Sequence, residues 1–280
     1  MSQHYQFSAD DSVSVKQQSH SKEPLWEIRG TGKIQISVNP ENPPDDSRFN
    51  DMLSLTVEGS VEVLVDSGVK LKNVEIHDDV RLQAANSRAL YVEAYGSSDA
   101  VCDHAMMLSM SEQSRAQVKS CDEVMFYSDE ARVKADHIAE WVNPESLETG
   151  QCVCPDVHNP FVLLRRDPLV RISKMNDRII QITGKGKAVF GEMGSSDMQY
   201  VVSGSVEIDA ASITGSVQLL DAASLKVGVI GGNLEMDYNT KCVLTGKQFE
   251  IRGAISKKNG GVLRYEPIVQ KREQTKGLKL

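Results

Sequence analysis

Aromatic residues are scarce in this sequence of 280 residues, since Trp, Tyr and Phe together make up 5% of it. That supply is thin for a large enzyme pocket and favours narrow, repetitive packing of aliphatic strands. With 40% hydrophobic and 25% charged residues, the chain still has the composition of a globular protein and can bury a sizeable core. At roughly 100 to 200 residues per domain, we expect two fused domains.

Long apolar runs are also lacking, and no stretch approaches the roughly 20 apolar residues of a membrane-spanning helix. Residues 1–21 contain neither a basic amino-terminal region nor an apolar run, so no secretory signal is predicted. The five cysteines are odd in number and scattered, unlike a disulfide framework. We therefore expect a soluble chain, either cytoplasmic or part of a virion, secretion machine or other assembly.

The net charge is 31 − 39 = −8, which argues against nucleic-acid binding by the chain as a whole. The charge is uneven, because residues 58–148 hold 8 basic and 18 acidic residues (8 − 18 = −10) and residues 241–280 hold 10 basic and 3 acidic ones (10 − 3 = +7). Partner binding by the basic tail is predicted for Lys271, Arg272, Lys276 and Lys279. Their partner would be an acidic protein, nucleic acid or the acidic flank of another copy.

Apolar and polar residues alternate from Leu25 onward, as in Ile34, Ile36 and Val38, which predicts half-buried strands. Between residues 53 and 142 such segments recur, and from Leu82 their centres lie about eight to ten residues apart, separated by Asp, Asn, Ser, Gly and Glu. The repeating unit is a strand followed by a tight turn. The chain is therefore predicted to be all-β.

Two architectures fit this rhythm: a β-solenoid resembling a parallel β-helix, or two β-sandwich domains. A sandwich usually has aromatic anchors and Asn-Gly or Asp-Gly hairpin turns, and the repetitive stretches contain neither dipeptide. A β-helix has a narrow interior of stacked aliphatic side chains. The solenoid is therefore favoured over the sandwich pair.

The chain also repeats itself. Residues 26–33 (WEIRGTGK) match residues 180–187 (IQITGKGK) at an offset of 180 − 26 = 154, and residues 57–63 (VEGSVEV) match residues 202–208 (VSGSVEI) at 204 − 59 = 145. We predict an internal duplication in which Gly32 is equivalent to Gly186 and Gly59 to Gly204. The glycines expected at structural corners are Gly30, Gly32, Gly59, Gly184, Gly186 and Gly204.

These patterns divide the chain into five segments. Residues 25–142 and 170–255 form the two β-repeat halves, and residues 143–169 form a proline-containing linker loop. Residues 1–24 are a polar arm, either flexible or able to bind a partner as a strand, and residues 256–280 are a basic tail.

The Gly-x-Gly-x-Ile element at Gly30 and the Gly-Ser-Val-x-Val element at Gly59 are similar to those of short-repeat parallel β-helices in bacterial adhesin-like heads and polymer-forming cytoskeletal proteins. The resemblance covers most of residues 25–255 as a cadence. It implies assembly or surface contact and no catalysis.

No constellation predicts a catalytic, cofactor or metal site. The paired glycines lack the third glycine and the helix of a dinucleotide fingerprint. Cys152, Cys154 and His158, with Asp156 nearby, fall short of the usual zinc ligand set, so Cys152 and Cys154 are predicted to bind no structural metal. His104 and His137 lie near no plausible nucleophile, and no Gly-x-Ser-x-Gly occurs.

Acidic residues recur between the strands and predict a solvated rim that prevents edge pairing, or else the paired carboxylates of a glycoside-cleaving β-helix. These are Asp78, Asp79, Asp99, Asp103, Asp122, Glu123, Asp129 and Glu130. The function expected is a non-enzymatic structural, assembly or binding subunit that associates with itself or with another protein. A carbohydrate-binding or carbohydrate-cleaving β-helix protein, and an inhibitor or effector of another protein, are the alternatives.

Overall fold

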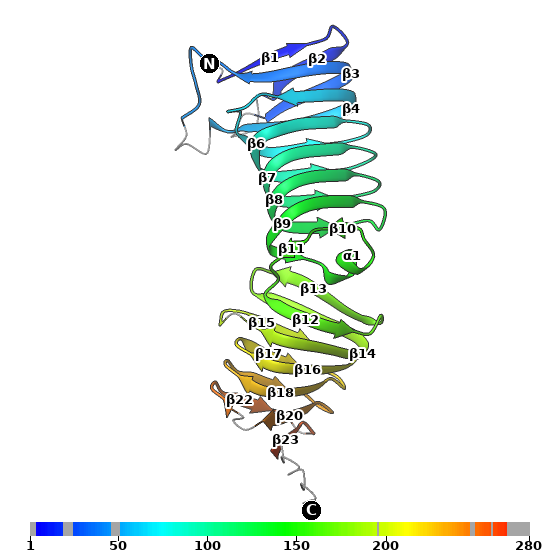
Figure 1. Cartoon of the computed structure of the whole chain (residues 1–280), viewed down its shortest axis with the longest axis vertical. Coiled ribbons are helices and arrows are strands. Elements are labelled where there is room, and N and C mark those ends of the chain that lie inside the picture. The colour runs from blue at the N-terminus through cyan, green and yellow to red at the C-terminus, as the bar shows by residue number, and fades with distance from the viewer. Residues whose placement is uncertain are drawn as a thin grey trace, which may run out of the picture. The chain divides into compact units, whose positions relative to one another are not determined.

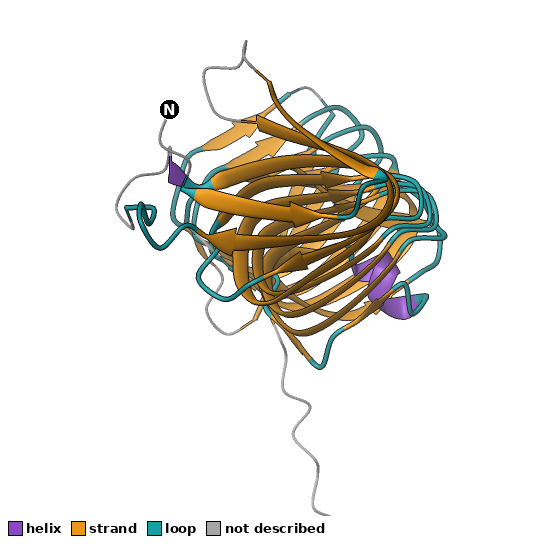
Figure 2. Ribbon diagram, turned by 90° about the horizontal axis from the view of Figure 1, so that it is seen from above, coloured by secondary structure: helices purple, strands orange, loops and turns teal. Residues whose placement is uncertain are grey.

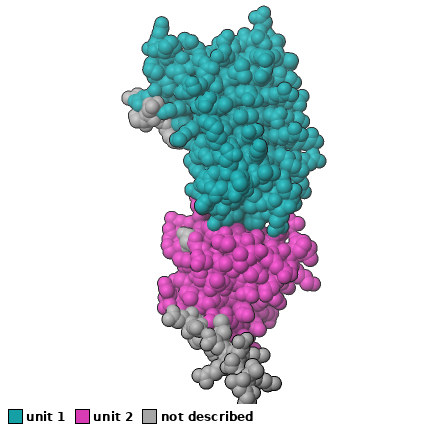
Figure 3. All heavy atoms as spheres, viewed as in Figure 1, with its two compact units in different colours: residues 1–159 teal, residues 160–280 magenta. Residues whose placement is uncertain are grey.

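A computed structural model describes residues 4–18, 25–45, 51–194, 196–246, 250–258 and 260–267. The chain is 68% strand and 2% helix and forms a β-solenoid of about 12 turns, as predicted in preference to the sandwich pair. Strands dominate Figure 2. The fold divides into two compact units, residues 1–159 and residues 160–280 (Figure 3), and each is described by itself.

Unit 1 is a stack of coils, most of which contribute one long strand that bends from one wall of the stack into a second wall (Figure 1). Its strands are β1 (Tyr5–Ala9), β2 (Val13–Gln18), β3 (Leu25–Val38), β4 (Leu53–Val65), β5 (Leu71–Ile76), β6 (Arg81–Ala94), β7 (Asp99–Met110), β8 (Arg115–Phe126), β9 (Arg132–Val142), β10 (Cys152–Val153) and β11 (Asp156–Val157). The short helix α1 (Pro144–Glu148) precedes β10, and Asn143 caps it with a side-chain hydrogen bond to the Glu145 amide.

The first wall and the second wall are each defined by a column of inward-facing residues in parallel register. The first wall follows the column Trp26, Leu55, Val74, Val92, Leu108, Val124 and Val142. The second wall follows the column Ile34, Val63, Leu82, Ala100, Ala116, Val133 and Cys152. Steps along the later second wall are 18, 16 and 17 residues (82 to 100, 116 and 133), so one coil takes two of the predicted strand spacings.

Unit 2 repeats this architecture with fewer coils. Its strands are β12 (Phe161–Arg166), β13 (Val170–Asn176), β14 (Ile179–Met193), β15 (Gln199–Val202), β16 (Ser205–Ile213), β17 (Ser216–Leu219), β18 (Ser224–Ile230), β19 (Leu234–Met236), β20 (Lys241–Gly246), β21 (Glu250–Ile251), β22 (Ile255–Lys257) and β23 (Val262–Pro267). Parallel pairing joins the coils after β14, and aliphatic side chains together with Phe190 and Tyr200 fill the interior.

The duplication extends to the start of each unit. In unit 1, β1 and β2 lie antiparallel on β3, and in unit 2, β12 and β13 lie antiparallel on β14. The turn between each pair holds an aspartate whose Oδ2 accepts a backbone hydrogen bond: Asp10 from Lys33 at 2.7 Å, and Asp167 from Lys187 at 2.8 Å. Each unit thus begins with its own antiparallel cap, which covers the first parallel coil.

The glycines predicted to be equivalent have matching surroundings. A Cβ on Gly59 would lie 2.4 Å from the Gly30 carbonyl oxygen, and one on Gly204 would lie 2.4 Å from the Gly184 carbonyl oxygen. A Cβ on Gly32 would meet Asp10 Oδ2 at 2.7 Å, and one on Gly186 would meet Asp167 Oδ2 at 2.8 Å. All six corner glycines have positive φ, a conformation that residues with a side chain rarely adopt. The neighbouring atoms also leave no room for a Cβ at these four positions.

The corners also use aspartates in the left-handed region. Asp78 (φ 56°) and Asp221 (φ 57°) each accept a hydrogen bond from the preceding coil, Asp78 from the Gly59 amide at 3.0 Å and Asp221 from the Gly204 amide at 2.9 Å. Replacing Asp78 with Ala removes the acceptor and puts Ala in that conformation, so we expect a loss of about 1–2 kcal/mol in the stability of unit 1.

Urea unfolding followed by circular dichroism measures this loss. Asp78→Asn keeps an acceptor and a residue that tolerates the conformation, so it should cost much less, and Asp221→Ala should repeat the effect in unit 2. Equal urea midpoints for Asp78→Ala and the unchanged chain would show that the hydrogen bond from the Gly59 amide to Asp78 does not stabilise the fold.

Three boundaries differ from the sequence prediction. Residues 5–9 and 13–18 of the expected polar arm are strands, because Tyr5 and Val13 are buried in the core. The ring of Phe7 also packs on that of Trp26, with the ring centroids 4.5 Å apart. The expected linker, residues 143–169, includes α1, β10, β11 and β12 and is divided between the two units. The expected basic tail from residue 256 includes β23, which pairs with β20 through six residue pairs.

Candidate docking face

The residues predicted to bind a partner, Lys271, Arg272, Lys276 and Lys279, lie outside the described residues, which end at 267. The corner glycines form the bend between the walls and carry no functional group. The remaining candidates lie on the outer faces of the walls, where side chains from successive coils form columns.

One such column on the outer face of the second wall alternates in charge. Register places Lys33 beside Glu62, Glu62 beside Arg81, Arg81 beside Asp99 and Asp99 beside Arg115. Asp10 of the cap lies beside Lys33, since its amide donates to the Lys33 carbonyl oxygen at 3.0 Å. We call Asp10, Lys33, Glu62, Arg81, Asp99 and Arg115 the charge ladder; its sign order is − + − + − +. The next register position, Arg132, is also basic and ends the alternation.

The local sequence explains the ladder. Each ladder residue from Lys33 to Arg115 immediately precedes a buried residue of the second wall, as Arg81 precedes Leu82, so strand alternation turns the charged side chain outward. Asp10 differs, because it lies in the cap turn and its Oδ2 accepts a hydrogen bond from the Lys33 amide. Parallel register then repeats that position once per coil, at a spacing of about 4.8 Å. The backbone positions of the ladder are therefore set by the register of the core strands.

Only part of this charge is neutralised along the ladder. Lys33 Nζ lies 2.7 Å from Glu62 Oε2, and the hydrogen bond with Glu62 raises the pKa of Lys33. Within the described part of the chain, Arg81, Asp99 and Arg115 form no ion pair. Three adjacent ladder positions thus present charge to solvent.

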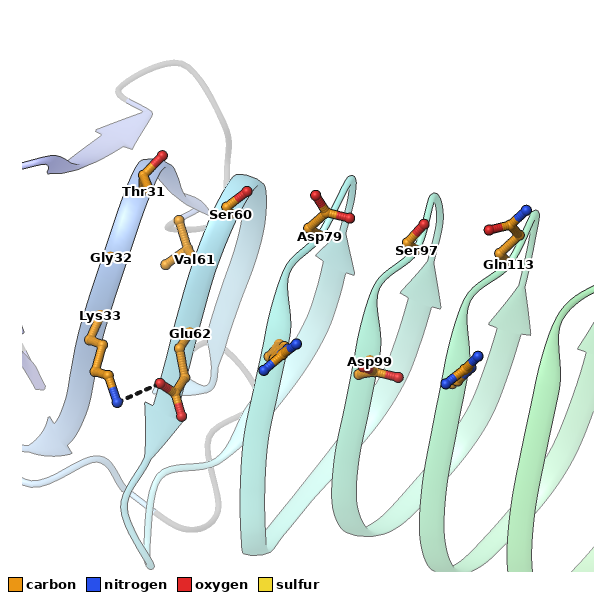
Figure 4. A pocket seen from close by; sticks show the side chains of 12 residues that line it. Thr31, Gly32, Lys33, Ser60, Val61, Glu62, Asp79, Ser97, Asp99 and Gln113 are labelled. Atoms are coloured by element: carbon orange, nitrogen blue, oxygen red, sulfur yellow. Dashed lines mark ion pairs between the residues drawn. The ribbon is translucent and has the colours of Figure 1, made fainter.

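The ladder residues from Lys33 to Arg115 line a shallow open hollow of about 730 Å³ (Figure 4). Along one side the corner residues Thr31, Ser60, Asp79, Ser97 and Gln113 form a polar ridge at the turn tips. Along the other side runs the uncharged column Gln35, Leu64, Gln83, Val101 and Gln117. A second hollow of about 550 Å³ continues along the same wall and includes Lys134 and Val153.

The hollow around the ladder contains no nucleophile with a base and no aromatic ring among its described lining residues. Its charged lining residues are Lys33, Arg81 and Arg115 against Glu62, Asp79 and Asp99, which sums to 3 − 3 = 0. A polyanion finds no net attraction there, and a sugar finds no ring to stack on. The arrangement is chemically suited to binding a surface with the complementary order of charges.

The acidic residues predicted to form one rim are dispersed. Asp78, Asp79, Asp129 and Glu130 lie at the corner turns, Asp99 belongs to the ladder, and Asp122 and Glu123 belong to β8. Asp103 binds Lys119 at 2.8 Å, and that hydrogen bond lowers the pKa of Asp103. The sequence could not show this dispersal, because the corner at which each turn lies depends on coil length.

A smaller hollow of about 270 Å³ lies on the outer face of the first wall and includes Asn73, Glu75, Tyr91 and Glu93. Glu75 and Glu93 are register neighbours on adjacent coils. Their carboxylates are engaged: Glu75 Oε1 lies 2.9 Å from His77 Nε2, and Glu93 Oε2 accepts from the Tyr95 hydroxyl at 2.9 Å. That hydrogen bond raises the pKa of Tyr95 to about 12.

Most of the cysteines are buried packing residues, and His104 contacts a serine on the next coil. Cys102, Cys121, Cys152 and Cys242 are buried, and desolvation raises the pKa of Cys102, Cys152 and Cys242 to about 12. Such thiols are inert packing residues. His104 Nδ1 lies 2.9 Å from Ser120 Oγ on the next coil.

Comparison with known proteins found no matching family model, curated protein or solved structure. The resemblance to short-repeat β-helices is therefore supported at the level of a parallel β-solenoid alone. Among the described residues, no helix is long and apolar enough to cross a membrane.

Proposed function

We propose that this chain is a non-enzymatic assembly subunit that associates with another copy of itself through the charge ladder. The observation that carries the proposal is the alternating order of the five charges from Lys33 to Arg115, one on each successive coil, with Asp10 of the cap beside Lys33. A partner surface must match both the sign order and the spacing, and a second copy of the same wall does both.

The match follows from symmetry. A two-fold axis parallel to the strands, passing between the Glu62 and Arg81 positions, brings two second walls face to face with their coil stacks reversed. Glu62 then faces Arg81 of the other copy, Lys33 faces Asp99, and Asp10 faces Arg115. All six ladder positions meet an opposite charge, which is the self-complementarity that an isologous dimer requires. Arg132, the next register position after Arg115, falls one position beyond Asp10 of the other copy.

The columns beside the ladder are compatible with this arrangement. The same axis places the column of Gln35, Leu64, Gln83, Val101 and Gln117 against itself, so no like charges are brought together there. Leu64 and Val101 supply apolar area, and the charges mainly set orientation and encounter rate. Since exposed ion pairs contribute about 0–1 kcal/mol each, we expect weak and salt-sensitive dimerisation.

Light scattering and sedimentation velocity over a concentration series test the proposal. At about 0.1 M salt the average molar mass should rise from that of a monomer toward that of a dimer as the protein concentration increases. At about 1 M salt it should return to the monomer value, because the Debye length shrinks from about 10 Å to about 3 Å. A chain that stays monomeric at every concentration in low salt contradicts the proposal. Dimerisation that strengthens with salt would assign the contact to an apolar surface elsewhere.

Carbohydrate binding is the second candidate, favoured by Tyr91 beside two carboxylates in the hollow of the first wall. Binding there should be lost in Tyr91→Ala and retained in Arg81→Glu, whereas dimerisation should respond in the opposite way. Calorimetric titration with neutral oligosaccharides tests the second candidate. If no oligosaccharide gives a heat of binding, carbohydrate binding is excluded.

A further inference from the structure

His137, Asp156 and His158 gather on one patch of unit 1, where each offers a ligand atom within 4.8 Å of the other two. His137 belongs to β9, and Asp156 belongs to β11, the parallel strand paired with it. The register pairs Asp156 directly with His137. His158 lies two residues after Asp156 and therefore points to the same side of the strand.

Short contacts already join the three side chains. His137 Nδ1 lies 2.7 Å from Asp156 Oδ2, and His158 Nε2 lies 3.0 Å from Asp156 Oδ1. The two imidazole rings are in edge contact, with centroids 5.2 Å apart. The hydrogen bond with His137 lowers the pKa of Asp156.

The backbone holds this patch in place. The His158 amide donates to the Ile138 carbonyl oxygen at 2.8 Å, and Cys154 Sγ donates to the Asp156 carbonyl oxygen at 3.2 Å. The side chains themselves are accessible, with exposed fractions of 39% for His137, 58% for Asp156 and 62% for His158. An ion can therefore reach the patch without any rearrangement of the fold.

We propose that these three residues form a binding site for a late divalent transition-metal ion such as Zn²⁺. Two imidazoles and one carboxylate suit Zn²⁺, Ni²⁺ and Cu²⁺, whereas Mg²⁺ and Ca²⁺ prefer oxygen ligands throughout. Two nitrogen ligands and one oxygen ligand leave a coordination position open to water. The site is distinct from the charge ladder and does not depend on the proposed function.

The metal site differs from the ligand set considered from the sequence, in which Cys152 and Cys154 accompanied His158. The structure buries Cys152 to 2% exposure in the second wall, and desolvation raises the pKa of the Cys154 thiol. The third ligand comes instead from His137, 19 residues before Asp156. Only the β9–β11 register brings His137 to this place.

Calorimetric titration of Zn²⁺ into the full chain without a histidine tag tests the site. We expect one ion per chain, and His137→Gln, Asp156→Asn and His158→Gln should each weaken binding by at least about tenfold. His104→Gln is the matched control, because it replaces a β-strand histidine bound to Ser120 and should leave affinity unchanged. Circular dichroism confirms that each variant is folded.

A Co²⁺ spectrum distinguishes these ligands from the cysteines. The proposal predicts no thiolate-to-metal charge-transfer band and unchanged affinity in Cys154→Ser. Unchanged affinity in His158→Gln, a charge-transfer band, or loss of binding in Cys154→Ser would each overturn it, as would the absence of Zn²⁺ binding by the unchanged chain.

Discussion

Arg81→Glu is expected to abolish dimerisation. In the two-fold arrangement Arg81 faces Glu62 of the other copy, so the substitution creates two like-charge contacts in each dimer. Like charges brought together at an interface cost several kcal/mol, which exceeds the expected stability of a weak contact. Sedimentation velocity should show monomer at concentrations where the unchanged chain is largely dimeric.

Arg88→Glu is the matched control for this substitution. Arg88 lies on the same strand, β6, and is also exposed, but it does not line the hollow around the ladder. Arg88→Glu changes the net charge by the same amount as Arg81→Glu. Dimerisation should therefore survive in Arg88→Glu. Equal loss in both variants would mean that overall charge controls association, and equal retention would remove the ladder from the interface.

Gly59→Ala is expected to cause a large loss of stability for the addition of a single methyl group. Gly59 has φ +98°, and its added Cβ would lie 2.4 Å from the Gly30 carbonyl oxygen. That atom belongs to the backbone of the neighbouring coil, so the two coils must separate. We expect about 3 kcal/mol or more, from backbone strain of about 1–3 kcal/mol plus the disrupted coil contact.

Gly68→Ala separates the two contributions. Gly68 has nearly the same φ, +94°, but its Cβ would find its nearest atom at 3.8 Å, on the Val38 side chain. It should show the conformational cost alone. Urea unfolding should therefore rank Gly59→Ala as clearly worse than Gly68→Ala, with Gly204→Ala in unit 2 resembling Gly59→Ala. Equal costs at residues 59 and 68 would contradict the close-packed corner.

The solenoid and its duplication could be predicted because both depend on local pattern. Alternation of residues such as Ile34 and Ile36 specifies a strand with one buried face whatever its neighbours are. The paired glycines at residues 30 and 32 mark a corner, and their repetition at 184 and 186 marks the second unit. The caps were not predicted because residues 5–18 contain few apolar side chains, although Asp10 and Asp167 each precede a buried valine by three residues.

The charge ladder and the histidine patch could not be predicted, because both depend on register between coils of unequal length. Successive ladder residues from Lys33 to Arg115 are separated by 29, 19, 18 and 16 positions, which shows no period in the sequence. His137 and Asp156 are likewise brought together across the insertion that contains α1. Neither the ladder residues nor the histidine patch forms a contiguous or regularly spaced motif in the sequence.

The most direct test of the assembly proposal mixes two charge variants that should not dimerise alone. Glu62→Arg places an arginine against Arg81 of its copy, and Arg81→Glu places a glutamate against Glu62, so each variant alone should be monomeric. In the mixed pair, the introduced arginine of one chain faces the introduced glutamate of the other, and the remaining Arg81 faces the remaining Glu62, which restores every opposite-charge contact. Sedimentation of an equimolar mixture should recover a heterodimer, and a mixture that stays monomeric while the unchanged chain dimerises would contradict two-fold pairing through the ladder.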